Sequence, residues 1–105
     1  MIITMILNNE PYGNEMSYNA LRYATALVAG SDASVRIFLL GSGVVCGLKD
    51  QKPPEGHYNI AHMLSILIKR NVVIRACGTC LDARGIHEDM LIDGVGKDSM
   101  SLLVD

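Results

Sequence analysis

Two cysteines three residues apart, Cys77 and Cys80, are the residues of this chain whose type and spacing best suit chemistry. They follow Val72–Ile74, an apolar, β-branched run that is typical of a buried strand. Gly85, five residues after Cys80, is placed to end a short helix. We therefore expect a strand, a tight turn that carries both thiols, and a helix that starts beneath them.

The residues around the cysteines favour a thiolate. Gly78 and Thr79 form the turn, and Thr79, followed three residues later by an aspartate, is a capping signature for the start of the helix. Helix N-termini present unpaired N–H groups, and cysteines in CxxC motifs titrate at about 3.5–7.5 instead of about 8.5. Arg84 would add a cation on the same helical face as Cys80. The sequence thus predicts that Cys77 is the nucleophile and that Cys80 resolves a mixed disulfide or persulfide.

Three other interpretations of the cysteines compete with this one. Free cysteine is among the most buried residue types, so simple packing stays open for both thiols. A structural disulfide does not suit a reducing compartment, and the chain has 3 cysteines, an odd number. A zinc site needs four ligands, and Cys46 and the 3 histidines lack ligand spacing. We therefore expect no bound metal.

Composition limits the class of protein. A chain of 105 residues, half of them apolar and 19% charged, predicts one folded domain spanning residues 1–105. The net charge of −2, without a basic cluster, argues against binding of nucleic acid. The apolar runs are too short for a membrane span, and the N-terminus lacks signal-peptide features, so we expect a cytoplasmic protein with reduced thiols. Gly41–Gly43 lacks the lysine and spacing of a phosphate-binding loop, and no cofactor is expected.

Strands and helices alternate along the chain. The expected elements, in order, are a strand at Ile2–Leu7 buried on both faces, a helix with Ala20, Tyr23, Ala24, Leu27 and Val28 on its apolar face, a strand at Val35–Leu40, a short helix from Ser42 to Cys46, a helix from Asn59 to Asn71, the strand before Cys77, a short helix at Ile86–Ile92, and a last helix through Met100, Leu102 and Leu103.

This alternation predicts an α/β fold with a parallel sheet. The loops that follow parallel strands meet at one edge of the sheet, where ligands bind. We therefore expect Asn8–Gly13, Gly41–Cys46 and Cys77–Cys80 to lie close together. Tyr12 would orient a ligand beside the thiols, and Cys46 would lie near them while packing into the core.

Four segments together resemble one known family, and in order they read NNEPYGNEMSYNALRYATAL, GSGVVCG, QKPPEGHYNI and CGTCLDARGI. They resemble the DsrE/DsrF-like family over Ile2 to about Met100. The resemblance implies a three-layer α/β/α domain on a mainly parallel sheet of about five strands, which assembles as dimers, trimers or hexamers. It also implies kinship with sulfur-relay proteins of the TusBCD and DsrEFH kind, whose persulfide-carrying cysteine lines up with Cys77. Cys80 has no counterpart in the relay subunits and is shared with a little-characterised branch of the family.

The end of the chain departs from the family pattern. Relatives continue past the last helix into another strand inside the sheet, whereas this chain stops at Asp105, within that expected helix. We expect this last strand to be absent, which would leave an open sheet edge. Either a partner covers the edge, or the chain is shortened relative to its family.

The leading functional prediction is a small sulfur-handling protein that accepts or carries persulfide sulfur through the CxxC cysteines, sulfurtransferase-like if it is catalytic. Its partners would be sulfur donor and acceptor proteins and further copies of itself. The first alternative is a thiol–disulfide redox protein or sensor that uses the same pair. The second alternative is a non-catalytic oligomeric binding module whose cysteines only pack.

Overall fold

The computed structural model describes residues 1–104, which form a four-stranded, all-parallel sheet with the strand order β1-β2-β3-β4. The strands are β1 (Ile2–Leu7), β2 (Ser34–Leu39), β3 (Val73–Cys77) and β4 (Val95–Asp98). The helical elements are α1 (Met16–Gly30), the 3-10 helix η1 (Gly41–Gly47), α2 (Ile60–Lys69), α3 (Gly78–Ala83), the 3-10 helix η2 (Glu88–Met90) and α4 (Ser101–Val104). The expected α/β class with a parallel sheet is confirmed.

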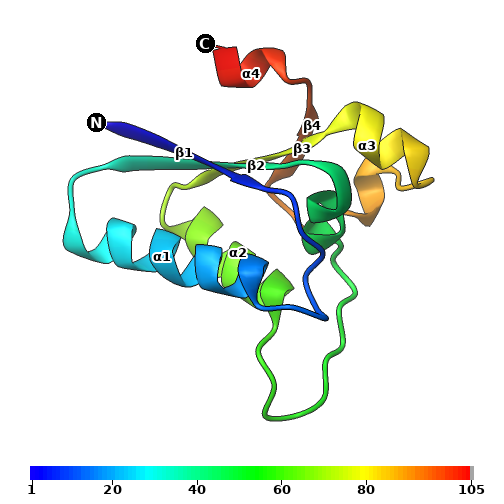
Figure 1. Ribbon diagram of the computed structural model, residues 1–105, viewed down its shortest axis with the longest axis horizontal. Coiled ribbons are helices and arrows are strands. Elements are labelled where there is room, and N and C mark those ends of the chain that lie inside the picture. The colour runs from blue at the N-terminus through cyan, green and yellow to red at the C-terminus, as the bar shows by residue number, and fades with distance from the viewer. Residues whose placement is uncertain (105) are drawn as a thin grey trace.

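The helices cover the two faces of the sheet unequally. Because the strands follow one another in chain order and parallel crossovers are right-handed, α1 and α2 come to lie on the same face. Figure 1 shows these two helices side by side on one side of the sheet, and the short α4 on the other. The helical layer on the α4 side of the sheet is therefore thin. The sheet formed by residues 1–104 has four strands, whereas the resemblance implied about five.

The core lies mainly between the sheet and the α1–α2 layer. Its side chains are almost all aliphatic, and fully burying one of them stabilises the fold by about 1.5–3 kcal/mol. Phe38, the single phenylalanine, is also fully buried. The largest fully buried aliphatic residues are Leu21, Ile37, Leu39, Val44, Ile60, Leu64, Leu67, Ile74 and Leu81.

The predicted ends of α2 are confirmed, whereas the buried face of α1 differs from expectation. The side chain of Asn59 caps α2 by accepting the His62 N–H at 3.0 Å. In α1, Tyr23 is 59% exposed, although it was expected on the apolar face. Leu21 and Ser17 are buried instead. The burial of Ser17 is tolerated because its hydroxyl donates a hydrogen bond to the Asn9 carbonyl oxygen at 2.7 Å.

Strand β1 is not buried on both faces, which corrects the sequence expectation. It pairs with β2 alone and lies at the edge of the sheet, so Ile2 and Ile6 are 72% and 46% exposed. Val73, at the start of β3, is also exposed, because it too lies on the side of the sheet opposite α1 and α2. Alternate residues of these strands point to opposite faces, and one face has little cover.

The region after Gly85 differs most from expectation. The helix predicted at Ile86–Ile92 is reduced to the single turn of η2, and Val95–Asp98 forms β4, a strand that the sequence pattern did not reveal. Gly94, at φ +97°, makes the turn into β4. The four residues of β4, Val-Gly-Lys-Asp, lack the alternation of apolar and polar residues by which a strand is recognised in a sequence. Only their parallel pairing with β3 defines them as a strand.

Among residues 1–104, every helix is too short or too polar to cross a membrane.

Candidate functional site

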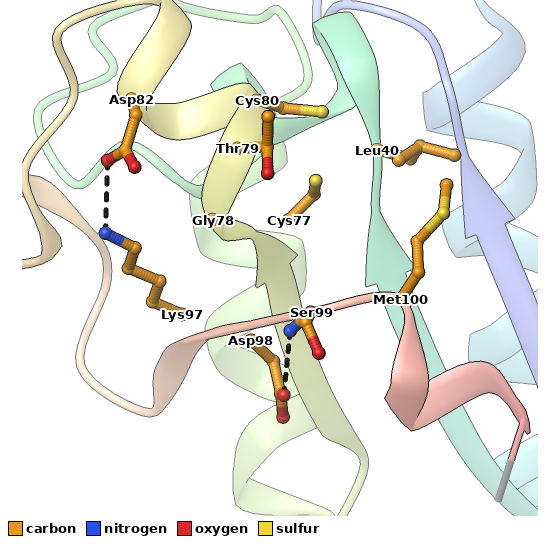
Figure 2. Close-up of a pocket in the computed structure, with 10 residues that line it drawn as sticks. All are labelled: Leu40, Cys77, Gly78, Thr79, Cys80, Asp82, Lys97, Asp98, Ser99 and Met100. Carbon is orange, nitrogen blue, oxygen red and sulfur yellow. Dashed lines mark hydrogen bonds and ion pairs between the residues drawn. The ribbon is translucent and has the colours of Figure 1, made fainter.

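The two candidate thiols share one open cavity. Its volume is about 700 Å³, and it lies where β3 and β4 end and α3 begins. Figure 2 shows Cys77 and Cys80 on one side of this cavity, with Leu40 and Met100 across from them. The CxxC motif was therefore correctly placed at a strand-to-helix junction and at the carboxyl edge of the sheet.

Cys77 is the N-cap residue of α3, and it is 6% exposed. Burial, which disfavours the charged thiolate, raises the pKa of Cys77, and the neighbouring Cys80 thiol raises it further. The backbone amides of Cys80 and Thr79 act in the opposite direction but do not compensate. The expected lowering of the Cys77 pKa is therefore wrong, because burial outweighs the helix N-terminus.

Cys80 has a different environment. It lies in the first turn of α3 and is partly exposed. The backbone N–H of Gly41, the first residue of η1, donates a hydrogen bond to the Cys80 sulfur at 3.2 Å. Gly41 has φ +57°, a conformation that favours glycine. Sequence reasoning missed this donor, although the glycines of Gly41-Ser42-Gly43 were the available signal for an unusual backbone.

Of the two residues between the cysteines, Gly78 has a structural role and Thr79 lacks the role expected for it. A Cβ atom at Gly78 would lie 2.9 Å from Cε of Lys97 and 3.4 Å from the carbonyl oxygen of Asp98, so a glycine lets β4 pack against the start of α3. Thr79 is exposed, and its side chain does not cap the helix, which starts at Gly78 with Cys77 as its N-cap. The expected Thr79 capping signature is therefore wrong.

The far end of α3 is held by a glycine, as predicted. Gly85 has φ +65°, and its N–H donates to the Asp82 carbonyl at 3.1 Å, while the Ile86 N–H donates to the Leu81 carbonyl at 3.0 Å. This pair of bonds is a Schellman motif. Arg84 was expected to place its cation beside the Cys80 sulfur, but its Nη1 donates to the Cys80 carbonyl oxygen at 3.1 Å.

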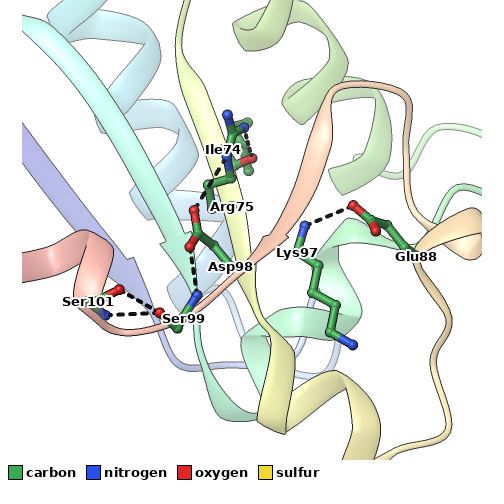
Figure 3. Close-up of polar contacts among 7 residues, drawn as sticks. All are labelled: Ile74, Arg75, Glu88, Lys97, Asp98, Ser99 and Ser101. Atoms are coloured by element: carbon green, nitrogen blue, oxygen red, sulfur yellow. Dashed lines mark hydrogen bonds and ion pairs between the residues drawn. The ribbon is translucent and has the colours of Figure 1, made fainter.

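Charged residues of β4 form the polar wall of the thiol cavity. Lys97 Nζ pairs with Asp82 Oδ1 at 3.0 Å, and Arg75 Nε lies 3.9 Å from Asp98 Oδ2. Asp98 also accepts the Ser99 N–H at 2.8 Å (Figure 3). Lys97, the cation that lines the cavity, is thus partnered by a carboxylate.

Tyr12 and Cys46 do not join the thiols, although all three loops meet at the same edge of the sheet. The Tyr12 hydroxyl donates to Gln51 Oε1 at 2.8 Å and accepts the Ile60 N–H at 3.1 Å, so it holds a loop. Cys46 is fully buried, as predicted, with its sulfur 3.4 Å from the Asn9 carbonyl oxygen. Burial raises the pKa of Cys46 to about 11. Neither residue lines the thiol cavity.

Metal ligands do not gather in the described chain. Within residues 1–104, no three side chains of His, Cys, Asp or Glu converge in a way that would hold a metal ion.

Comparisons with known proteins identify the family. The model of the DsrE/DsrF-like family matches residues 1–105. Protein YchN of Escherichia coli K12 is 48% identical over 94 residues, which cover 89% of this chain and 80% of YchN. The crystal structure of the E. coli ychN protein superposes with a TM-score of 0.89 at 44% identity and covers 98% of this chain and 87% of that one. A Vibrio vulnificus protein named sulfurtransferase TusD homolog is 26% identical over 84 residues, 79% of this chain and 64% of that protein. The chain therefore belongs to the DsrE/DsrF-like family.

Proposed function

We propose that this protein accepts a sulfane sulfur atom and passes it on through Cys77 and Cys80, in a reducing compartment such as the cytoplasm. The observation that carries the proposal is a pair of free thiols at the start of a helix that line the same open cavity. The name of the TusD homolog as a sulfurtransferase supports this class of chemistry.

The two thiols have unequal environments, and we assign them different roles. Cys80 is the more exposed, and the Gly41 N–H at its sulfur stabilises negative charge there. Cys80 is therefore the entry thiol, and the more deeply buried Cys77 is the storage thiol. This order differs from the sequence prediction, in which Cys77 was the first nucleophile.

Loading consists of two exchanges of one sulfur atom, and delivery reverses both, with an acceptor thiol in place of the donor thiol, so that the acceptor gains the outer sulfur and gives its proton to Cys80. In the first, the Cys80 sulfur attacks the outer sulfur of a donor persulfide, so a new S–S bond forms, the S–S bond of the donor breaks, and the Cys80 proton passes to the departing donor thiolate. In the second, Cys77 attacks the outer sulfur of the Cys80 persulfide and transfers its proton to Cys80. The Gly41 N–H then stabilises Cys80 as the leaving group. No net oxidation occurs.

Mass spectrometry of the loaded protein tests the proposal. Incubation with inorganic polysulfide should add about 32 Da, one sulfur atom, to the peptide that carries both cysteines. The Cys80→Ser variant should load slowly, and the Cys77→Ser variant should hold the added sulfur on Cys80. Cys46→Ser is the matched control and should load like the unaltered protein. Loading of Cys80→Ser at the unaltered rate would refute the entry role, and absence of any adduct would refute the function.

A thiol–disulfide redox protein is the second candidate function. The position of Cys77 and Cys80 favours it, since both free thiols lie at the start of α3 and line one cavity. An external disulfide would take up the two electrons and two protons. This function requires a reversible Cys77–Cys80 disulfide with a potential of about −120 to −270 mV. If an oxidant leaves both thiols free, this candidate fails.

A non-catalytic binding module is the remaining alternative, and the burial of Cys77 is the observation in its favour. In this case neither thiol would react faster than free cysteine with an alkylating agent at neutral pH. The alkylation experiment described in the Discussion separates this alternative from both kinds of thiol chemistry.

The proposed function includes self-association. Exposed apolar side chains of β1 and β3, namely Ile2, Ile6 and Val73, lie on the face of the sheet opposite α1 and α2. Apolar side chains gathered on a thinly covered sheet face are typical of a surface that a second subunit covers. Light scattering after size-exclusion chromatography should give a mass above that of one chain, and Ile6→Lys should lower it. A monomeric mass for the unaltered protein would contradict self-association.

A further inference from the structure

A second cavity lies away from the thiols. Its volume is about 380 Å³, and its walls come from the loop after β1, from η1 and from the loop that precedes α2. Pro11, Val45, Leu48 and Pro53 are among its apolar lining residues. None of its lining residues takes part in the thiol cavity, so the two cavities are separate sites.

Partly buried hydrogen bonds fix the shape of this second cavity. The Gln51 side chain donates to the carbonyl oxygens of Cys46 and Leu48, at 2.8 Å each, and accepts from the Tyr12 hydroxyl at 2.8 Å. The same hydroxyl accepts the Ile60 N–H at the start of α2. These contacts join all three wall segments, so the cavity exists before any ligand arrives. A preformed cavity lowers the entropic cost of binding.

Two aromatic side chains, tilted by 47° to one another, are among the lining residues of this cavity. The rings of Tyr12 and His57 both line it, with centroids 6.2 Å apart. His57 stacks on Tyr58 at 4.4 Å, and Tyr58 stacks on Tyr18 at 4.1 Å, so the His57 ring is supported from behind. Ring faces held in this way favour a flat, apolar ligand group.

The charge of the second cavity is positive. Lys52 lines it, and no carboxylate does. Among residues 1–104, no hydrogen bond or ion pair engages the Lys52 ammonium, whereas Lys97, which lines the thiol cavity, is paired with Asp82. The Tyr12 hydroxyl and the Gln51 amide are already occupied by protein partners. The one free charged group would therefore attract an anion.

We infer that the second cavity binds a small organic anion with a flat, apolar body, such as an aromatic carboxylate. The body lies against the Tyr12 and His57 rings, and the carboxylate faces Lys52. The volume of about 380 Å³ falls at the lower end of the range of known small-molecule sites, which suits a ligand of one or two rings. This inference does not rest on the thiols or on the proposed sulfur chemistry.

Binding of 2-naphthoate and of the neutral 2-naphthamide, followed by NMR, tests the inference. Naphthoate should shift the signals of the Gln51 side-chain amide and of the Val45 and Leu48 backbone amides in a saturable manner. Naphthamide should bind about 2- to 5-fold more weakly, because an exposed ion pair is lost. Lys52→Glu should weaken binding of naphthoate about 10-fold and leave naphthamide unchanged, because it replaces an attractive charge with a repulsive one.

The neighbouring Lys49 provides the matched control. Lys49→Glu changes the net charge by the same amount, but Lys49 does not line the second cavity, so naphthoate should bind this variant as it binds the unaltered protein. Well-dispersed NMR spectra of both variants show that each is folded. The inference is overturned if naphthoate produces no saturable shifts up to its solubility limit. It is equally overturned if naphthamide binds as tightly as naphthoate, or if the two lysine variants behave alike.

Discussion

The three cysteines should react with an alkylating agent in a fixed order, with Cys80 fastest, Cys77 slower and Cys46 slowest. Cys80 is partly exposed and receives the Gly41 N–H, while Cys77 is nearly buried and has a raised pKa. Thiolate is the reacting form, so burial slows a cysteine twice, by blocking the reagent and by raising the thiol pKa. The rate of Cys80 relative to free cysteine is the direct test of an activated thiol, because exposure alone would already place Cys80 ahead of the two buried cysteines.

The magnitude for Cys46 follows from its pKa. Burial raises that pKa from 9.0 to about 11. Two pKa units reduce the thiolate fraction at neutral pH about 100-fold. Cys46 is also fully buried, so its alkylation in the folded protein should be at least about 100-fold slower than that of an unhindered cysteine. Cys46 thus serves as an internal reference for a thiol that only packs.

Timed labelling with iodoacetamide, followed by peptide mass spectrometry, measures the order. Cys46 lies far from the other two cysteines in sequence and will be found on a separate peptide, while fragmentation distinguishes Cys77 from Cys80. Repeating the experiment in urea should make the three rates similar, which shows that the folded structure causes the differences. Labelling of Cys77 before Cys80 in the folded protein would refute our assignment of entry and storage thiols. Labelling of Cys80 no faster than free cysteine would favour the non-catalytic alternative.

Three further predictions concern stability, each measured by urea unfolding. The raised pKa of Cys46 means that the folded state prefers the protonated thiol. The free energy of unfolding should therefore be unaffected well below pH 9.0 and should fall by about 2 kcal/mol as the pH rises from 9.0 to about 11. Cys46→Ser should lack this component, and an equal pH dependence in both proteins would contradict it. Gly43→Ala should lower the free energy of unfolding by about 1–3 kcal/mol, because the added Cβ would lie 1.9 Å from the Leu7 carbonyl oxygen. Gly30→Ala is the control: a Cβ there would have no atom within 4 Å, so this substitution should be neutral or slightly stabilising. Asn59→Ala should cost about 1 kcal/mol by removing the α2 cap, and a negligible loss would show that the cap is dispensable.

Sequence patterns correctly predicted the elements whose ends are determined by a local signal, such as a capping side chain or a glycine. The three longest strands were placed to within a residue or two, and α2 was bounded correctly by Asn59 and by Asn71, which has φ 70°. The glycine after α3 was also read correctly, since only a left-handed residue completes that helix end. In each case one side chain or one glycine decides the local backbone.

Features that depend on distant contacts were not predicted. The exposure of Ile2 and Ile6 follows from the edge position of β1, which no pattern within six residues reveals. Strand β4 is defined by its pairing with β3. At the site, the hydrogen bond from Gly41 to Cys80 joins residues 39 positions apart. The sequence pattern placed both thiols at a strand-to-helix junction and ranked Cys77 as the nucleophile, but it could not reveal the burial of Cys77 or the Gly41 N–H, because both come from tertiary packing.

The anchoring of α3 at both ends limits how the thiols can move. A helix of six residues is too short to be stable alone, so β3 before it and the Schellman bonds after it hold it in place. Local fraying at one end cannot change the separation of the sulfurs without breaking one of these anchors. Any rearrangement that accompanies sulfur loading or oxidation should thus involve the whole segment from Cys77 to Ile86 in a single step. Hydrogen exchange across this segment would then show one shared opening rate instead of a gradient.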